Sequence, residues 1–370
     1  MKKIGIISFH RSHNCGSIMQ AYAMQTLLSK MGVQPIFIDF STVGQDEMYA
    51  VYTKQKGIKG IIKNILFWIN RDMLQRHWED YDQFIKKHLI LSSKLGENCN
   101  MKVLDNDYDA FLCGSDQVWN VTIPDYSDVY FLNFSQKTKI AYAPSFGARD
   151  PRKFSNNIEN IKTWLNNIDY LSIRENSGRT MLKELTGRDV PVVLDPTLML
   201  NEEEYSMLEE DSGEIKPYIF YYATLHSKEL DRFVKKLSKK LGVRVIVWNS
   251  KEYILRSEWA NGFRMAYHQN PGVYLNLIKN AEIVVTTSFH GTVFSTVYRK
   301  KFWVLKNGDM YKGDDRIMTM TDALGISSRV ISTNFDENKN YLEEVDYETY
   351  EQALDIERKE SAKFLKACLE

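Results

Sequence analysis

Residues 282–298 read EIVVTTSFHGTVFSTVY, and this stretch decides the fold. Its first part, Glu282–Thr287, is a short β-branched run that is typical of a buried parallel strand, and from 290 to 299 the apolar residues take a helical spacing. Ser288 and His290 stand at the junction. Ligands of open parallel sheets bind at this end of the strands, beside the free N–H groups of the following helix. The turn is therefore a candidate site.

The same alternation of short strands and longer helical segments extends over most of the chain. The expected strands of a first unit are Ile4–Ser8, Pro35–Phe40, Tyr108–Cys113, Lys139–Ala143, Tyr170–Ile173 and Val190–Leu194. Those of a second unit are Tyr218–Ala223, Val243–Trp248, Glu282–Thr287 and Phe302–Leu305, with helices over 228–241, 271–280 and 290–299. This alternation is typical of parallel strands covered by helices on both faces. We expect an α/β fold of two doubly wound domains that face one another across a cleft.

The length of 370 residues favours two domains, because a single hydrophobic core stops growing below that size. The stretch 201–216 is acidic and poor in strands, so we place the domain junction there. We expect an N-terminal domain over 1–200 with a helical insertion at about 54–90. A C-terminal domain would follow over 201–335, and a closing helix in 336–370 could pack back on the first domain.

Composition excludes several classes of partner. Lysine plus arginine and aspartate plus glutamate both total 48, so the net charge gives no general reason to bind nucleic acid. The four cysteines are scattered without a C-x-x-C pair, which argues against a zinc site and against a disulfide framework and favours the reducing cytoplasm. The apolar run near the start is too short for a signal peptide, and we expect neither a membrane span nor a bound metal or cofactor.

The segment 58–69, IKGIIKNILFWI, predicts a basic amphipathic helix. One face carries Ile58, Ile61, Ile62, Ile65, Leu66 and Ile69, and the nearby lysines are Lys54, Lys56, Lys59 and Lys63. We favour packing of this face on the core or on a partner subunit, since that is the ordinary arrangement. The alternative is a helix that lies on a membrane surface, which would matter for a lipid-linked substrate. The oligomeric state is not specified by the sequence.

The first strand leads into a second candidate turn, residues 8–17. Gly16 would let the backbone approach a ligand closely, and Asn14, Ser17 and Gln20 offer hydrogen bonds. A strand–glycine–helix turn is also a common structural device, so a ligand role and a purely structural role stay open here.

A third candidate turn lies in residues 112–120, LCGSDQVWN. An apolar strand ends at Gly114 and Ser115, and Asp116 follows them. The carboxylate could enter a cleft, or it could cap the segment after the turn without any substrate.

Together these stretches resemble the polysaccharide pyruvyl transferase family. The resemblance rests on NPGVYLNLIKNAEIVVTTSFHGTVFSTVYRKKFWVL at 270–305, LSIRENSGRTMLKEL at 171–185, VVLDPTLML at 192–200, NCGSIMQAYAMQTLL at 14–28 and CGSDQVWN at 113–120. It covers most of residues 4–330, while residues 41–100 carry little of it.

The resemblance implies two Rossmann-like domains in a glycosyltransferase-B-like (GT-B-like) arrangement. It also implies that phosphoenolpyruvate is the donor and a saccharide the acceptor, and that the product is a pyruvate ketal in exopolysaccharide biosynthesis. Donor-site roles fall on His290 and Arg174. In this chain Ser288 stands where some members carry a basic residue, so Arg316 is a substitute cation for the phosphate. Cys15 stands where an aromatic residue is frequent.

The chemistry of phosphoenolpyruvate suggests a role for each residue. His290 would transfer a proton, aided by the helix-start N–H groups of Gly291 and Thr292. The planar fork of Arg174 matches a phosphate or a carboxylate, unless Arg174 is paired with Glu175 instead.

On the acceptor side, Asp116 would orient or deprotonate a hydroxyl, and Asn14 and Gln20 would bind oxygens of the acceptor or donor. Asp195, before Pro196, is interpreted as a structural acid that caps its turn. Two other functions fit the same architecture: a nucleotide-sugar-dependent glycosyltransferase and a non-catalytic saccharide-binding protein.

Overall fold

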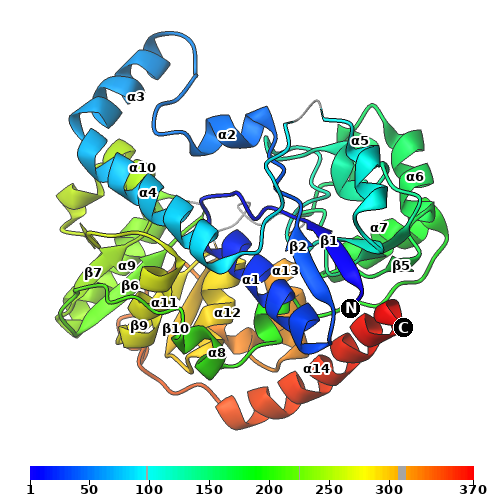
Figure 1. The fold of residues 1–370 in the computed structure, drawn as a ribbon. Coiled ribbons are helices and arrows are strands. Elements are labelled where there is room, and N and C mark those ends of the chain that lie inside the picture. The colour runs from blue at the N-terminus through cyan, green and yellow to red at the C-terminus, as the bar shows by residue number, and fades with distance from the viewer. Residues whose placement is uncertain (97–98, 225, 307–313) are drawn as a thin grey trace.

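The computed structural model describes residues 1–96, 99–224, 226–306 and 314–370, and it contains two parallel sheets (Figure 1). The first sheet has the order β2-β1-β3-β4-β5. Its strands are β1 (Lys3–Ile7), β2 (Gln34–Phe37), β3 (Ala110–Cys113), β4 (Thr138–Ala141) and β5 (Tyr170–Leu171). The second sheet has the order β11-β10-β9-β6-β7-β8. Its strands are β6 (Tyr218–Tyr222), β7 (Arg244–Val247), β8 (Arg264–Met265), β9 (Ile283–Thr286), β10 (Phe302–Lys306) and β11 (Val330–Ser332).

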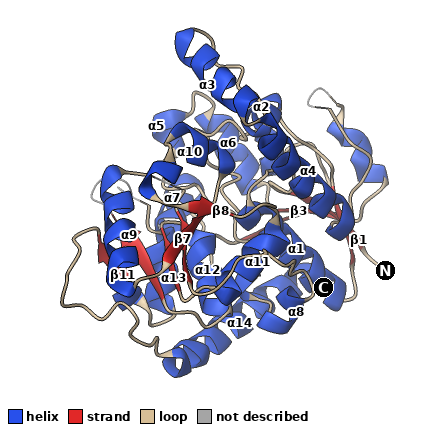
Figure 2. Cartoon of the chain, turned by 90° about the vertical axis from the view of Figure 1, so that its left-hand side faces the viewer, coloured by secondary structure: helices blue, strands red, loops and turns tan. Residues whose placement is uncertain are grey.

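Helices separate the strands and cover the sheets (Figure 2). In the N-terminal half these are α1 (Cys15–Lys30), α2 (Val43–Tyr49), α3 (Ile58–Ile69), α4 (Arg71–His88), α5 (Pro151–Phe154), α6 (Ile158–Asn166) and α7 (Asn176–Thr186). In the C-terminal half they are α8 (Glu202–Ser206), α9 (Lys228–Leu241), α10 (Ser250–Leu255), α11 (Pro271–Asn280), α12 (Phe289–Val297), α13 (Arg316–Ala323) and α14 (Tyr347–Leu369). The expected helices 228–241 and 271–280 are confirmed as α9 and α11.

Three apolar layers cover the two sheets, and the central layer is shared by both. Alternate residues of a strand enter different layers, so Leu112 of β3 lies in the central core while its neighbour Phe111 lies in the outer one. The central core also receives Phe220 and Val284 from the second sheet. Both sheets are buried on both faces and share this central core. The turns that follow strands of the two halves meet beside it.

One expected strand is absent, and two short strands were not expected. Val190–Leu194 forms no strand, and only Val192 makes a β-bridge, to Ile173. Pro191 has no N–H to donate, which leaves too few donors in this segment for a ladder. The unexpected strands, β8 and β11, are two and three residues long, too short for their periodicity to be recognised.

The C-terminal helix α14 touches both halves. Its Tyr350 hydroxyl donates to Thr296 Oγ1 at 2.8 Å, in the C-terminal half. At its other end the Leu194 amide donates to Ser361 Oγ at 2.9 Å, and Lys2 Nζ donates to the Leu369 carbonyl at 3.1 Å. The helix therefore runs back to the first sheet, next to the N-terminus (Figure 1). The domain boundaries drawn at 200 and 335 stay a prediction.

The insertion between β2 and β3 forms α3 and α4, and α3 projects from the body of the molecule (Figure 1). The helix at 58–69 is confirmed. We had favoured packing of its isoleucine face on the core or on a partner subunit. The face is exposed in this chain, so it does not pack on the core, and packing on a partner subunit stays a prediction. Leu66 was assigned to that face and instead packs beside buried Phe67 on the opposite side. Among the described helices, none is long and apolar enough to cross a membrane.

Candidate active site

The three turns expected from the sequence meet at one cavity of about 500 Å³ between the two sheets. The first turn contributes Asn14 and Ser17, the second contributes Asp116, and the third contributes Ser288 and His290. Arg316, at the start of α13, also lines the cavity. The convergence follows from the fold, because all three turns stand at carboxyl ends of parallel strands.

A buried carboxylate, Asp195, lies behind this cavity and gathers residues from both halves. Arg174 Nη1 donates to Asp195 Oδ2 at 2.6 Å, and the Ser115 hydroxyl donates to the same oxygen at 2.8 Å. His290 Nε2 lies 3.6 Å from that oxygen as well. Asp195 is 1% exposed. A carboxylate so deeply buried needs such partners, because an unpaired buried charge is very costly.

The partners decide the ionisation of Asp195. Burial alone would raise the pKa of the Asp195 carboxyl group, but His290, Arg174 and Thr197 outweigh burial and hold this pKa far below its ordinary value. Asp195 also accepts hydrogen bonds from the amide and hydroxyl of Thr197, which confirms the expected capping role before Pro196. The sequence interpretation missed its second role, which is to hold Arg174 and His290 in place.

The alternative considered for Arg174, an ion pair with Glu175, is not what the structure shows. Arg174 bonds Asp195, its Nη2 lies 3.8 Å from Asp116 Oδ1, and its guanidinium carbon lies 4.5 Å from the centre of the Phe289 ring. The side chain is 2% exposed and lies one layer behind the cavity wall. Its Nε and Nη2 atoms have no hydrogen-bond partner among the described residues.

Gly16 fixes the position of the His290 ring. A Cβ at residue 16 would lie 2.1 Å from His290 Nδ1 and 2.4 Å from Cγ, closer than any real contact. The glycine expected to admit a ligand therefore admits an imidazole from the other half of the molecule. With one ring edge against Gly16 and Nε2 toward Asp195, His290 is held from two sides.

The other residues of the first two turns brace each other. Asn14 caps α1 by accepting from the amides of Gly16 and Ser17, and the Ser17 hydroxyl donates to Asp116 Oδ2 at 2.5 Å. Gln20 is fully buried and donates to Ser8 Oγ and to the Ser17 carbonyl. Gln20 therefore supports the turn from behind and does not line the cavity.

Gly114 and Ser115 also stand behind the cavity wall. Gly114 has a φ of 107°, and a Cβ there would lie 2.3 Å from the Tyr142 carbonyl oxygen. Asp116, which does face the cavity, has a φ of 77°, in the left-handed region that non-glycine residues rarely adopt. The turn is thus shaped to bring this one carboxylate into the cavity.

Two N–H groups at the start of α12 already donate to acceptors within the same turn. Ser288 Oγ accepts from the Gly291 amide at 3.3 Å, and the Ser288 carbonyl accepts from the Thr292 amide at 3.0 Å. The N–H groups of Gly291 and Thr292, which we expected to serve a ligand, therefore already have acceptors within the turn. The first-turn amides of Phe289 and His290 remain as the donors of this helix start.

Arg316 lines the cavity as expected, but its guanidinium is already paired with a carboxylate. Its guanidinium makes two hydrogen bonds to Asp314, at 2.9 and 2.6 Å. Arg149, which the sequence interpretation missed, also lines the cavity, and its guanidinium carbon lies 5.6 Å from the centre of the Phe154 ring. It lies in a loop with no helical or strand period, so no sequence signal marked it.

A second residue missed from the sequence is Asp125. It lines the cavity, accepts a hydrogen bond from the Ser12 hydroxyl at 3.1 Å and leaves Oδ1 without a partner among the described residues. Burial raises the pKa of the Asp125 carboxyl group to about 6, against the opposing effect of its hydrogen bonds from Ser12 and Gln45. A carboxyl group with that pKa can both take up and release protons near neutrality.

A second cavity of about 420 Å³ opens beside the first, and the two share four lining residues: Asn14, Met48, Tyr49 and Thr224. Several aromatic rings line this second cavity, which we call the aromatic cavity. The lining rings include His13, Tyr49, Trp78, Tyr81 and Trp248. His13 and Tyr81 are stacked with their ring centres 5.2 Å apart. Trp78 and Tyr81, both on α4, thus form part of a cavity wall.

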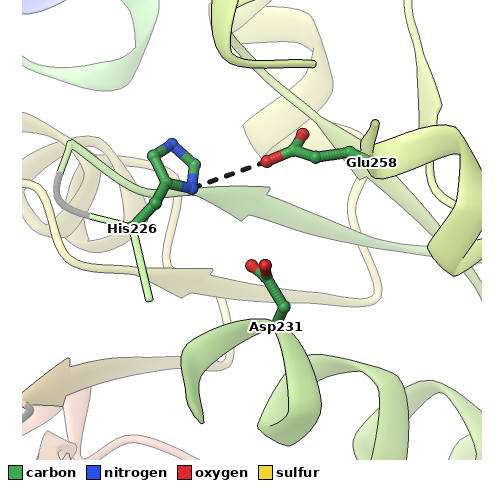
Figure 3. Close-up of side chains that lie close together, drawn as sticks. All are labelled: His226, Asp231 and Glu258. Carbon is green, nitrogen blue, oxygen red and sulfur yellow. Dashed lines mark ion pairs between the residues drawn. The ribbon is translucent and has the colours of Figure 1, made fainter. Parts of the chain in front are cut away.

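The described residues hold one cluster with the composition of a metal site, and it lies outside both cavities (Figure 3). The donor atoms of His226, Asp231 and Glu258 lie within 4.8 Å of one another. Arg256 Nη2 already donates to Asp231 Oδ2 at 2.6 Å, so a guanidinium supplies positive charge there. Burial raises the pKa of Glu258 to about 7 and lowers that of His226, which favours the neutral forms of both.

Comparison with known proteins supports one family and one fold. The family model described as polysaccharide pyruvyl transferase matches residues 14–309. Among curated proteins no match was found. HepE of Anabaena, solved with UDP, is 10% identical, with a TM-score of 0.54 over 99% of this chain and 100% of that one. MnaA of S. aureus, also solved with UDP, is 12% identical, with a TM-score of 0.51 over 96% and 88%. The architecture is therefore α/β, with two Rossmann-like domains in a GT-B-like arrangement.

Gly16→Ala tests the contact between the first turn and His290. The added methyl group must displace the imidazole, so we expect a loss of about 1–3 kcal/mol in the free energy of unfolding and a changed His290 rotamer. Denaturant unfolding and a crystal structure of the variant measure both. Gly96→Ala is the control, because a Cβ at Gly96 meets no atom within 4 Å. An unmoved His290 with unchanged stability would contradict the contact.

Glu175→Gln tests the protonation of a second buried acid. Burial raises the pKa of Glu175 to about 7, while Arg174, Arg316 and hydrogen bonds from Ser145 and Phe146 act in the opposite direction. The wild type should therefore lose up to about 3 kcal/mol of stability as the pH rises from the unfolded pKa to the folded one.

The glutamine variant lacks that titration. Its stability relative to the wild type should rise between about pH 4.5 and pH 7 and level off above. Denaturant unfolding at a series of pH values measures the difference, and a pH-independent difference would show that Glu175 titrates normally.

Proposed function

The chain belongs to the polysaccharide pyruvyl transferase family, a family of transferases, and from that premise we propose that it moves the enolpyruvyl group of phosphoenolpyruvate onto a saccharide. The product would be a pyruvate ketal on a precursor of a cell-surface polysaccharide, formed in the cytoplasm. The observation that carries this proposal is the placement of His290 at the cavity wall, backed by the buried pair of Asp195 and Arg174.

The donor requires groups for two anionic ends. Arg149 and Arg316 line the cavity, and the amides at the start of α12 lie beside it. Arg174 has two buried nitrogen atoms without acceptors among the described residues. Unpaired buried donors are costly, so a phosphate or carboxylate oxygen that enters between His290 and Asp116 would stabilise this guanidinium. We therefore assign Arg174 and Arg316 to the donor.

The reaction begins with protonation of the donor's methylene carbon, which we assign to His290. The adjacent carbon then gains oxocarbenium character, and a saccharide hydroxyl attacks it while Asp116 accepts the hydroxyl proton. Phosphate leaves with the bridging oxygen, and a second hydroxyl closes the ketal. Of the two hydroxyl protons, one balances the new methyl group and the other leaves with inorganic phosphate. Asp125, with its raised pKa, is suited to accept the second proton.

The aromatic cavity beside the donor cavity suits the acceptor. Sugar rings present flat C–H faces that pack on aromatic side chains, and the half-buried Tyr49 and Trp78 line this cavity. Asn14 belongs to both cavities, so it can bind an oxygen of either substrate. This placement would bring the acceptor hydroxyls toward Asp116.

Ligand stabilisation tests the donor. A ligand that binds only the folded protein at 100 times its Kd raises the free energy of unfolding by about 2.7 kcal/mol. We expect phosphoenolpyruvate to raise the Tm in a concentration-dependent way, and UDP and UDP-sugars to leave it unchanged. Stabilisation by UDP and not by phosphoenolpyruvate would instead favour the nucleotide-sugar-dependent glycosyltransferase.

His290→Ala tests the proton donor. With a competent acceptor, we expect phosphate release to fall by about 10²–10⁴-fold, the usual contribution of general acid–base catalysis. The Tm of the unliganded variant shows whether the fold is kept. His268→Ala is the control, because His268 is half exposed and lies outside both cavities. Wild-type rates in a folded His290→Ala variant would remove His290 from the mechanism.

A further inference from the structure

The helix α3 presents a continuous apolar face to solvent. Six bulky side chains on this face are 53–76% exposed: Ile58, Ile61, Ile62, Ile65, Trp68 and Ile69. Their spacing of three and four residues places them along one side of the helix. Exposed apolar residues are ordinary when scattered singly, but six along three turns form a contiguous patch, which is uncommon in monomeric soluble proteins.

The opposite side of α3 is already packed. Phe67 is buried with Leu74 of α4 and Ile254 of α10, and Leu66 packs against the same cluster. Gly60 is also buried on this side. The helix is therefore held in a fixed orientation by one face, and the isoleucine face has no cover from the described residues. Figure 1 shows the helix projecting away from both sheets.

The charged residues within 48–70 all have one sign. Lys54, Lys56 and Lys59 are exposed and Lys63 is half-buried, while no acidic residue occurs between Met48 and Asn70. Lys54 alone of these four lysines has an ion pair among the described residues, to Glu47. Lys59 and Lys63 lie one residue after Ile58 and Ile62, so both lie along the same edge of the apolar face. An apolar strip edged by lysines is complementary to a surface with anionic groups above an apolar layer.

We propose that α3 docks on the surface of an anionic lipid bilayer, with its isoleucine face inserted at the level of the acyl-chain boundary. The flanking lysines would lie among the anionic head groups. Trp68, at the end of the helix, would lie at the interface, where amphipathic indole rings are favoured. The helix is only 12 residues long, so it can lie on a membrane but cannot cross one.

A second copy of this chain fits the same face poorly. In a two-fold symmetric dimer the same patch meets itself, so the lysines of both copies would gather in one interface, to which residues 48–70 contribute no acidic residue. A bilayer offers the opposite arrangement, because its anionic groups outnumber the lysines. The charge pattern therefore selects lipid over self-association.

The docking would place the aromatic cavity close to the membrane. The next helix, α4, continues from α3 and lines that cavity with Leu74, His77, Trp78 and Tyr81. If the cavity receives the acceptor, a saccharide carried on a membrane lipid would reach it without leaving the surface. This consequence rests on the proposed function, whereas the docking itself does not.

Vesicle flotation of the full-length protein tests the proposal. The probes are vesicles of phosphatidylcholine alone and vesicles that also contain phosphatidylglycerol, at low and at high salt. We expect the wild type to float with the anionic vesicles at low salt, and far less with neutral vesicles or at high salt. Failure to float with anionic vesicles under any of these conditions would overturn the proposal.

Matched variants separate docking through α3 from non-specific hydrophobic binding to vesicles. Ile61→Glu with Ile65→Glu should weaken binding to anionic vesicles by about tenfold or more, and Lys59→Gln with Lys63→Gln should weaken it while preserving the apolar face. Ile356→Glu is the control, because Ile356 is equally exposed but lies on α14. Equal flotation of the Ile61 and Ile65 variant and the wild type would overturn the assignment to α3.

Light scattering without lipid tests whether a second copy of the chain covers the isoleucine face instead. A wild type that is dimeric, and becomes monomeric on Ile61→Glu with Ile65→Glu, would show that a second copy covers the face and would overturn the proposal. An unchanged Tm in each variant shows that the fold is kept. Because flotation needs no substrate, failure of phosphoenolpyruvate turnover would leave this result standing, and failure of flotation would leave the turnover result standing.

Discussion

The carboxylate of Asp195, buried between the two sheets, is the constraint on which the site depends. A buried anion must be matched by cations and hydrogen-bond donors, and here Arg174 and Ser115 come from the N-terminal half while His290 comes from the C-terminal half. Removal of any partner leaves a charge that water cannot reach. The interaction therefore does two things at once: it joins the two halves at one point, and it orients the imidazole that faces the cavity.

The second constraint is steric: at two positions of the site there is no room for a Cβ, so only glycine fits. The imidazole of His290 lies where a side chain at position 16 would be, so the first helix of one half and the donor-facing helix of the other can meet only because residue 16 has no Cβ. Gly291 is subject to a similar limit, since a Cβ there would lie 2.2 Å from Thr286 Oγ1. The cavity is thus shaped by close approach of backbones, while its polar groups come from the turns between them.

Much of the fold and of the candidate site could be predicted from the sequence, and there are physical reasons why some residues were missed. The turns with Asn14, Asp116 and His290 were found because each follows a buried parallel strand, a local pattern. The central role of Asp195 was missed because its partners are separated by 21, 80 and 95 residues, and no local period reports such contacts. Asp125 and Arg149 lie in loops that carry no period at all. The exposure of α3 was missed because periodicity identifies an apolar face but not what covers it.

The account's central claim is that a small doubly anionic enol phosphate binds in the cavity beside His290. A crystal structure with phosphoenolpyruvate, or with an unreactive analogue of it, tests the claim most directly. The account predicts density for the phosphate and carboxylate between His290, Asp116 and Arg316, with Arg174 bonded to one of the two groups. A cavity that stays empty with this ligand, and fills when a nucleoside diphosphate is supplied, would contradict it.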